Sequence, residues 1–207
     1  PLPPPTEVPP GTLLAGRDPK VRAASLRRWG GTTETEAAVA RGLQFLARHQ
    51  RPDGSWSFRF DRTADCDRTC TGPGGSDSDV AATALALLPF LGAGQTHKEG
   101  QYTTEVRKAL EWLLAQQGED GDLRGSGDGQ MYAHGLAAIV LCEAYYMTGH
   151  PELRVAAQQA VNFIVRAQHS AGGWRYQPGQ PGDTSVVGWQ VMALKTAQAA
   201  NLYVPAR

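Results

Sequence analysis

The sequence predicts an all-α protein built of repeated helical hairpins, and two observations lead to this prediction. First, an apolar segment that ends in Gln, followed by Gly and then an apolar anchor residue, occurs three times in the 207 residues. Second, each copy is followed by another, more apolar segment of helical length. Such recurrence is typical of repeat proteins, in which each unit packs against the next.

The repeated motif predicts where each first, outer helix ends. The apolar spacing before each Gln fits one face of a helix, and the following Gly supplies the backbone freedom that a turn needs. The structural repeat residues are Gln50, Gly54 and Trp56 in the first copy, Gln117, Gly121 and Leu123 in the second, and Gln168, Gly172 and Trp174 in the third. We expect Trp56 and Trp174 to be partly buried beside their Gln side chains and to tie adjacent hairpins together.

The first hairpin is expected to begin with a capping box at Thr33-Glu34-Thr35-Glu36 and to end its outer helix near Gln50. Its inner helix should run from Asp79 to Leu91, with Gly92 and Gly94 marking its end. An insertion between Trp56 and Asp79 makes this repeat longer than the others.

The insertion contains Asp65, Cys66, Asp67 and Cys70. The Cys66 and Cys70 pair is compatible with a small disulfide, with half of a metal site, or with neither, and the sequence leaves these alternatives open. A polar loop bordered by Gly and Pro is usually a solvated loop. The third cysteine, Cys142, falls in an apolar helical pattern and is expected to be buried.

The second hairpin places its outer helix before Gln117 and its inner helix at Met131 to Met147, ended by Gly149. The third begins at Pro151, a residue that the first turn of a helix tolerates, and its inner helix spans Thr184 to Ala200. The second helices are rich in Ala, Leu and Val, whereas the first carry Arg, Lys, Glu and Gln. The more apolar set should therefore form the inner layer.

Composition excludes two classes of partner. Lys plus Arg and Asp plus Glu both number 20, and no basic run is present, so we expect no nucleic-acid binding. No apolar stretch approaches the roughly 18 to 20 residues of a membrane-spanning helix. We assign residues 1–32 to a Pro-rich linker and N-terminal extension and residues 33–207 to the repeat domain. The sequence has no initiator Met, so we expect it to belong to a longer one, and it indicates no compartment.

The run from Arg41 to Trp56 resembles the QW motif of squalene-hopene and oxidosqualene cyclases, and the third copy resembles it too. The segment from Gly172 to Asp183 is similar to the repeats of protein prenyltransferase β subunits. The resemblance covers about residues 33 to 203. In this family, helical hairpins close a six-membered α/α toroid around an apolar cavity for an isoprenoid. The resemblance implies about three of the six hairpins here, the rest coming from a missing C-terminal part or a partner chain.

The resemblance also nominates catalytic residues. Cyclases of this type protonate their substrate with an Asp of a DxDD motif, and the nearest match is Asp77-Ser78-Asp79-Val80, in which Val80 replaces the last Asp. Asp79 is therefore a candidate catalytic acid, with an N-cap of the inner helix or a solvated loop carboxylate as the alternatives. His134, expected near the start of the second inner helix, is a second candidate, as an acid or base or as a hydrogen-bonded packing residue.

Prenyltransferases bind zinc through Asp-x-Cys and a distant His, but the comparable Asp183-Thr184-Ser185 has a hydroxyl in place of the thiol. We therefore expect no metal and no cofactor. Asp183 is either a ligand contact or the N-cap of the third inner helix. Tyr132 and Trp189 are candidate ligand contacts that would offer π faces to an apolar molecule or a cation, with core packing as the alternative.

These observations predict a squalene-cyclase-like or prenyltransferase-like domain that holds an apolar ligand, an isoprenoid, in a cavity lined by inner helices. Because neither the DxDD nor the Asp-x-Cys motif is intact, catalysis stays an open question. The alternative function is a catalytically inert α/α-toroid scaffold that binds a protein or peptide. A fold alone does not choose between them, because function resides in sites.

Overall fold

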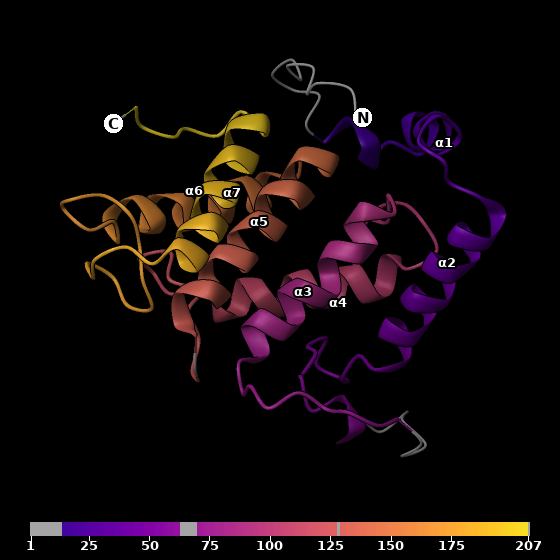
Figure 1. Cartoon of the computed structure of the whole chain (residues 1–207), viewed down its shortest axis with the longest axis horizontal. Coiled ribbons are helices and arrows are strands. Elements are labelled where there is room, and N and C mark those ends of the chain that lie inside the picture. The colour runs from indigo at the N-terminus through magenta and orange to yellow at the C-terminus, as the bar shows by residue number, and fades with distance from the viewer. Residues whose placement is uncertain (1–13, 63–69, 128, 207) are drawn as a thin grey trace.

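The computed structural model describes residues 14–62, 70–127 and 129–206, and within these ranges the chain is all-α, as predicted. Figure 1 shows the arrangement of the helices. The α-helices are α1 (Pro19–Arg28), α2 (Thr33–Arg48), α3 (Asp79–Gly92), α4 (Thr103–Gln116), α5 (Gln130–Thr148), α6 (Pro151–Arg166) and α7 (Thr184–Ala199), and the short 3-10 helices are η1 (Ala15–Arg17) and η2 (Phe60–Arg62).

The helices form two layers. The inner helices α3, α5 and α7 contact one another in chain order, α3 to α5 and α5 to α7. The outer helices pack on them from one side, α4 on α3 and α6 on both α5 and α7, and α2 contacts α3 at the start of the array. Helix α4 thus packs on the inner helix of the preceding hairpin, α6 packs on the inner helices of the preceding hairpin and of its own, and α2 packs on the inner helix of its own hairpin.

The composition of each helix explains its layer. In α5, every residue from Ala133 to Ala144 is buried, because this helix is covered on several sides by α3, α6 and α7. Outer helix α4 buries only one stripe, Val106, Ala109, Leu110 and Leu113, and exposes three charged residues, Arg107, Lys108 and Glu111. The expectation that the more apolar helices form the inner layer agrees with this burial.

The capping residues of two helices differ by one position from the prediction. The capping box of α2 is formed by Thr32 and Thr35: the Thr32 hydroxyl accepts from the Thr35 backbone N–H, and the Thr32 N–H donates to the Thr35 hydroxyl. Helix α3 is capped by Ser78, whose hydroxyl accepts from the Ala81 N–H, so the alternative that Asp79 is the N-cap is wrong. The first helical residue is Asp79 itself.

The described segment before α2 is largely helical and contacts the inner helices α3 and α5. It contains η1 and α1, and Arg17 of η1 forms an ion pair with Glu143 of α5 at 3.0 Å. The Glu143 side chain is only 6% exposed, so the guanidinium neutralises a carboxylate that burial would otherwise destabilise. No helix in the described ranges is long and apolar enough to cross a membrane.

Candidate functional site

Gln side chains join each hairpin to the next. The Gln50 amide donates to the carbonyl of Gly54 in its own turn, at 2.9 Å, and to the carbonyl of Glu105 in α4, at 2.8 Å. Gln117 makes the equivalent pair of bonds, to the turn of the second hairpin and, at 3.0 Å, to the carbonyl of Ala156 in α6. The same amide therefore satisfies a turn carbonyl and links it to the following outer helix.

The Trp residues act within one hairpin. The Trp56 indole N–H donates to the Leu46 carbonyl of α2 at 2.8 Å, and the Trp174 indole N–H donates to the Ile164 carbonyl of α6 at 2.7 Å. Both rings are buried, at 3% and 5% exposure, more deeply than predicted. Each of these indole bonds goes to the outer helix of its own unit, so the indole N–H groups do not link adjacent hairpins, and a tie through packing of the rings stays a prediction. Leu123 occupies the second anchor position and is fully buried.

The turn glycines lie against the next hairpin. Gly54 has φ of +94°, and a Cβ at this position would lie 2.5 Å from the Lys108 carbonyl oxygen of α4. Gly121 has φ of +88° and would clash in the same way with the Gln159 carbonyl of α6. Gly172 has the same kind of conformation, φ of +90°, but a Cβ there would meet no atom within 4 Å. The third turn is open at the place where the first two are covered.

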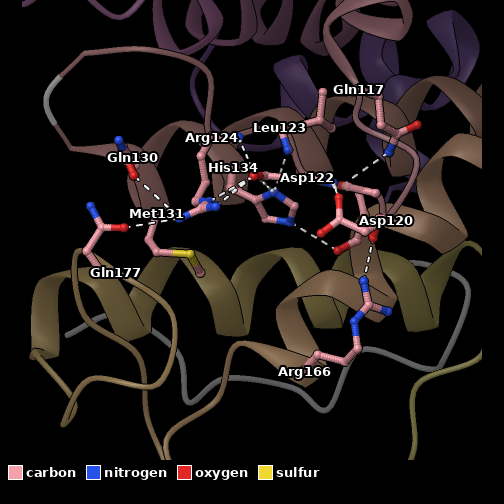
Figure 2. Close-up of polar contacts among 12 residues, drawn as sticks. Gln117, Asp120, Asp122, Leu123, Arg124, Gln130, Met131, His134, Arg166 and Gln177 are labelled. Carbon is pink, nitrogen blue, oxygen red and sulfur yellow. Dashed lines mark hydrogen bonds and ion pairs between the residues drawn. The ribbon is translucent and has the colours of Figure 1, made fainter.

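His134 is fully buried between α5 and α6 (Figure 2). Its Nδ1 accepts from the Leu123 backbone N–H at 3.0 Å, and its Nε2–H donates to the Ala160 carbonyl at 3.0 Å. Burial lowers the pKa of this imidazole to about 4, against the opposing effect of the Ala160 carbonyl. Both ring nitrogens are engaged by backbone groups, which is the arrangement of the packing alternative; a role for His134 as an acid or base stays a prediction.

An ion pair lies beside this imidazole. Arg124 and Asp122 are joined at 2.8 Å, and Arg124 also donates to the Gln177 side chain at 3.0 Å, as Figure 2 shows. Partial burial raises the pKa of Asp122, but the hydrogen bonds and charge of Arg124 outweigh this effect and hold the pKa below its ordinary value. The guanidinium also lies over the ring of Phe163 at 5.3 Å. This network joins the turn before α5 to the turn before α7.

Asp79 forms an ion pair with Arg51, at 2.6 Å between Oδ2 and Nη1. Arg51 comes from the turn that follows α2, so the pair connects the two helices of the first hairpin. The Asp79 side chain is 38% exposed. A carboxylate held in this way is a hydrogen-bond acceptor, whereas a catalytic acid must donate a proton. The assignment of Asp79 as a catalytic acid remains a prediction.

The starts of α5 and α7 bring two of the candidate ligand contacts together. Tyr132 Oη lies 2.5 Å from Ser185 Oγ, and Ser185 in turn donates to Asp183. Asp183 caps α7 by accepting from the Ser185 and Val186 backbone N–H groups, so the N-cap alternative is confirmed. The Ser185 hydroxyl, more than any other interaction, lowers the pKa of Asp183. In the sequence alone, Ser185 stands out only as a hydroxyl at the place where a zinc-binding thiol would be expected.

Aromatic side chains flank this polar chain. The ring of Tyr176 lies 6.2 Å from that of Tyr132, and Tyr176 is 43% exposed. Trp189, one and a half turns into α7, is half-buried. The N-terminal ends of α5 and α7 and the loop before α7 therefore carry hydroxyls, one carboxylate and three aromatic rings, an arrangement that can contact an apolar molecule with a polar end. The roles of Tyr132, Asp183 and Trp189 as ligand contacts stay predictions.

Among the described residues, no group of three or more His, Cys, Asp and Glu side chains is placed to hold a metal ion. Cys66, one member of the cysteine pair that could supply half of a metal site, lies outside the described residues, as do Asp65 and Asp67. Cys70 lies within the described residues, and its Sγ lies 3.3 Å from His49 Nε2. Cys142 is buried as predicted, and burial, followed by the charge of Glu143, raises the pKa of its thiol to about 12.

Comparison with known proteins finds two terpene-forming enzymes. The chain is 27% identical over 167 residues to human lanosterol synthase, an alignment that covers 76% of this chain and 19% of that enzyme. It is 25% identical over 189 residues to drimenyl diphosphate synthase of Streptantibioticus cattleyicolor, covering 89% of this chain and 32% of that enzyme. The chain thus spans a third or less of the length of these relatives. No family model and no solved structure matches.

Proposed function

We propose that this chain is an arc of a terpene-cyclase-like helical domain and that its inner helices hold a long apolar ligand, an isoprenoid. The observation that carries the proposal is the array of three apolar inner helices, α3, α5 and α7, in a chain similar to two terpene-forming enzymes. The distant likeness supports a cyclase-like domain. The ligand and its place are inferred from the side chains below.

The proposed contacts lie on the N-terminal halves of the inner helices. Leu85 of α3 is 39% exposed, although it belongs to a helix that is otherwise mostly buried. Tyr132 of α5 and Trp189 of α7 are half-buried and present aromatic surface beside the Ser185 and Asp183 hydrogen bonds. Apolar and aromatic surface with a few convergent polar groups is typical of small-molecule sites.

We assign this arc a binding role toward the ligand. Proton-initiated cyclisation needs a carboxylic acid that gives up its proton. Asp79 is held as an acceptor by Arg51, and both nitrogens of His134 are engaged by backbone groups. The residues that this arc contributes therefore line the ligand site and orient the apolar ligand.

A further hairpin of the same repeat is proposed to cover the last unit. Three positions, counted from each N-cap, are buried in α3 and α5 but exposed in α7. They are Ala86, Leu87 and Phe90 in α3, Ala137, Ala138 and Leu141 in α5, and Val191, Met192 and Lys195 in α7. The open turn at Gly172 lies in the same unit. A repeat array needs such a flank covered or capped.

The test of the ligand is native mass spectrometry of the protein purified from its own host, with extraction and identification of bound lipid. We expect an isoprenoid at a fixed ratio to protein. The variant Leu85→Asp places a charge on the proposed ligand surface, and we expect it to purify with at least about tenfold less of this lipid, the equivalent of about 1.4 kcal/mol in binding.

The matched control is Val39→Asp, which introduces the same charge at a side chain of similar exposure, 41%, on outer helix α2. This variant should retain the lipid. A protein that carries no isoprenoid, or one that loses it equally in both variants, contradicts the proposal. Circular dichroism and a denaturant titration of both variants establish that each is folded.

A further inference from the structure

A chain of hydrogen bonds joins the starts of the inner helices α5 and α7. The Tyr132 hydroxyl of α5 lies 2.5 Å from Ser185 Oγ of α7, and Ser185 hydrogen-bonds to Asp183, the N-cap of α7. Tyr132 is half-buried, whereas Ser185 is exposed. The chain of bonds therefore lies on the surface where the ligand contacts were proposed, with Tyr132 and Asp183 at its two ends.

The directions of these hydrogen bonds follow from the carboxylate. The Ser185 hydroxyl, more than any other interaction, holds the pKa of Asp183 below its ordinary value, so this group is ionised at neutral pH and can only accept. Ser185 has one hydroxyl hydrogen and donates it to Asp183. The hydrogen between Ser185 and Tyr132 must therefore come from Tyr132. The Tyr132 oxygen then offers a ligand a lone pair and no hydrogen.

The other end of the chain of bonds also offers only an acceptor. Asp183 accepts from the Ser185 hydroxyl and from the Ser185 and Val186 backbone N–H groups, and all three bonds use Oδ1, so Oδ2 is available as a further acceptor. These backbone N–H groups at the start of α7 could have bound an anionic ligand, but the Asp183 side chain already occupies them. A ligand group placed here meets acceptors and a negative charge.

The positive charges nearby are weak competitors. Arg175 makes the smallest contribution to the lowered pKa of Asp183, and its Cζ lies 5.4 Å from the centre of the Tyr176 ring. Its side chain is exposed, so solvent screens its charge. The charge of Arg124 is paired with that of Asp122. The acceptors and the carboxylate therefore dominate this polar surface.

We propose that this chain of hydrogen bonds selects a ligand whose polar end is a hydroxyl group, an isoprenoid alcohol in preference to an isoprenoid phosphate. The inference rests on the proposed function, since it names the polar end of the same apolar ligand. The ligand hydroxyl donates to the Tyr132 oxygen, while the hydrocarbon chain contacts the aromatic surface of Tyr132 and Trp189. Tyr132 is then a specificity-determining residue, and Ser185 and Asp183 orient its hydroxyl. A phosphate would bring further negative charge next to that of Asp183.

The experiment compares three ligands with the same hydrocarbon chain: a linear sesquiterpene alcohol, its methyl ether and its monophosphate. The methyl ether can accept a hydrogen bond but cannot donate one. Equilibrium dialysis at neutral pH measures the affinity of each ligand for delipidated protein purified from its own host. We expect the alcohol to bind roughly fivefold to tenfold more tightly than the ether, the equivalent of one hydrogen bond, and at least about fivefold more tightly than the monophosphate.

Three variants locate the selectivity. Tyr132→Phe removes the acceptor and keeps the ring, so it should reduce the affinity for the alcohol to that for the ether. The same change at exposed Tyr203, in Tyr203→Phe, is the matched control and should leave the three affinities unchanged. Asp183→Asn keeps a residue that can cap α7 but removes the charge, so the monophosphate should gain affinity relative to the alcohol.

The outcomes separate this inference from the proposed function. An ether that binds the wild type as tightly as the alcohol, or a monophosphate that binds more tightly, overturns the hydroxyl end, while isoprenoid binding itself stands. If none of the three ligands binds, the proposed function fails and this inference fails with it. An alcohol preference that persists in folded Tyr132→Phe overturns the role of Tyr132. The comparison of the three ligands on the wild type decides even if Tyr132→Phe does not fold.

Discussion

Helices α5 and α7 are equivalent elements of neighbouring repeats, yet they differ in what covers them. At the same position from the N-cap, α5 has Ala138, which is fully buried, whereas α7 has Met192, which is 53% exposed. Helix α5 contacts three helices, α3, α6 and α7, whereas the main contacts of α7 are with two, α5 and α6. The difference shows that the burial of an inner helix depends on its place in the array and on the helices that pack around it there. The exposed side of α7 corresponds in position to the side of α5 that packs on a neighbouring helix, but no described part of the chain packs on it.

We expect the largest difference in stability between α5 and α7 from the pair of variants Ala138→Lys and Met192→Lys. Lys at position 138 would bury an unpaired ammonium in a close-packed helix, so we expect a loss of at least about 4 kcal/mol in the free energy of unfolding. At position 192, the same side chain would reach solvent, and the change should stay within about 0.5 kcal/mol. Urea titration of both variants of this chain measures the difference. Equal losses would mean that α7 is as covered as α5.

Next in size are the anchors of the first and last hairpins. Trp56→Ala and Trp174→Ala each remove a buried ring and its hydrogen bond, and each should cost about 3 to 5 kcal/mol. Exposed Trp29, at 69%, serves as the control, and Trp29→Ala should cost less than about 0.5 kcal/mol. Chemical denaturation followed by circular dichroism provides the values. A loss below about 1 kcal/mol for Trp174→Ala would refute its role as an anchor.

His134 makes the middle hairpin sensitive to acid. Its folded pKa of about 4 lies below the ordinary value, so between about pH 6.5 and pH 4 the unfolded chain binds a proton that the folded chain does not. Its contribution is fully present above about pH 6.5 and is lost as the pH falls through that window, by about 3 kcal/mol in total.

His134→Thr copies the residue that α3 has at the equivalent position, Thr83. This variant should lose that component of the pH dependence, whatever it costs in stability at pH 7. The measurement is the free energy of unfolding at several pH values for both proteins. Parallel curves for wild type and variant would show that His134 does not titrate between the folded and unfolded states as described.

The smallest of these effects concerns the joint between hairpins. Gln117→Ala removes the amide that bonds the second turn to Ala156 and should cost about 1 to 3 kcal/mol, because buried carbonyls lose their donor. Gln198→Ala, on the exposed face of α7, is the matched control and should change stability by less than about 0.5 kcal/mol. If both variants unfold at the same urea concentration, the amide is not the joint.

Much of the fold follows from local sequence signals. The inner helix predicted at Met131 to Met147 spans Gln130–Thr148, because its apolar run and the following Gly149 define it without distant contacts. Helix caps were predicted one residue away because neighbouring Ser, Thr and Asp residues can all cap a helix. The choice of Ser78 over Asp79 depends on which backbone N–H groups the side chain reaches.

Contacts between segments that are far apart in the chain could not be predicted from the sequence. Tyr132 and Ser185 are 53 residues apart and meet only because α5 and α7 pack in a particular register. The prediction also did not separate the roles of Gln50 and Trp56, because both belong to one motif. In the structure, Gln50 hydrogen-bonds to α4, whereas the Trp56 indole hydrogen-bonds to α2. His49 contacts Cys70, which lies within the insertion that no repeat pattern describes.

The most direct test of the proposed arc is methionine oxidation by hydrogen peroxide, read by peptide mass spectrometry, because the three methionines differ in cover. In this 207-residue chain, Met192 should oxidise fast and fully buried Met131 slowly, with half-buried Met147 between them. In the protein as isolated from its host, the account predicts that Met192 becomes as slow as Met131, because a further hairpin covers α7. A Met192 that oxidises equally fast in both preparations would contradict it.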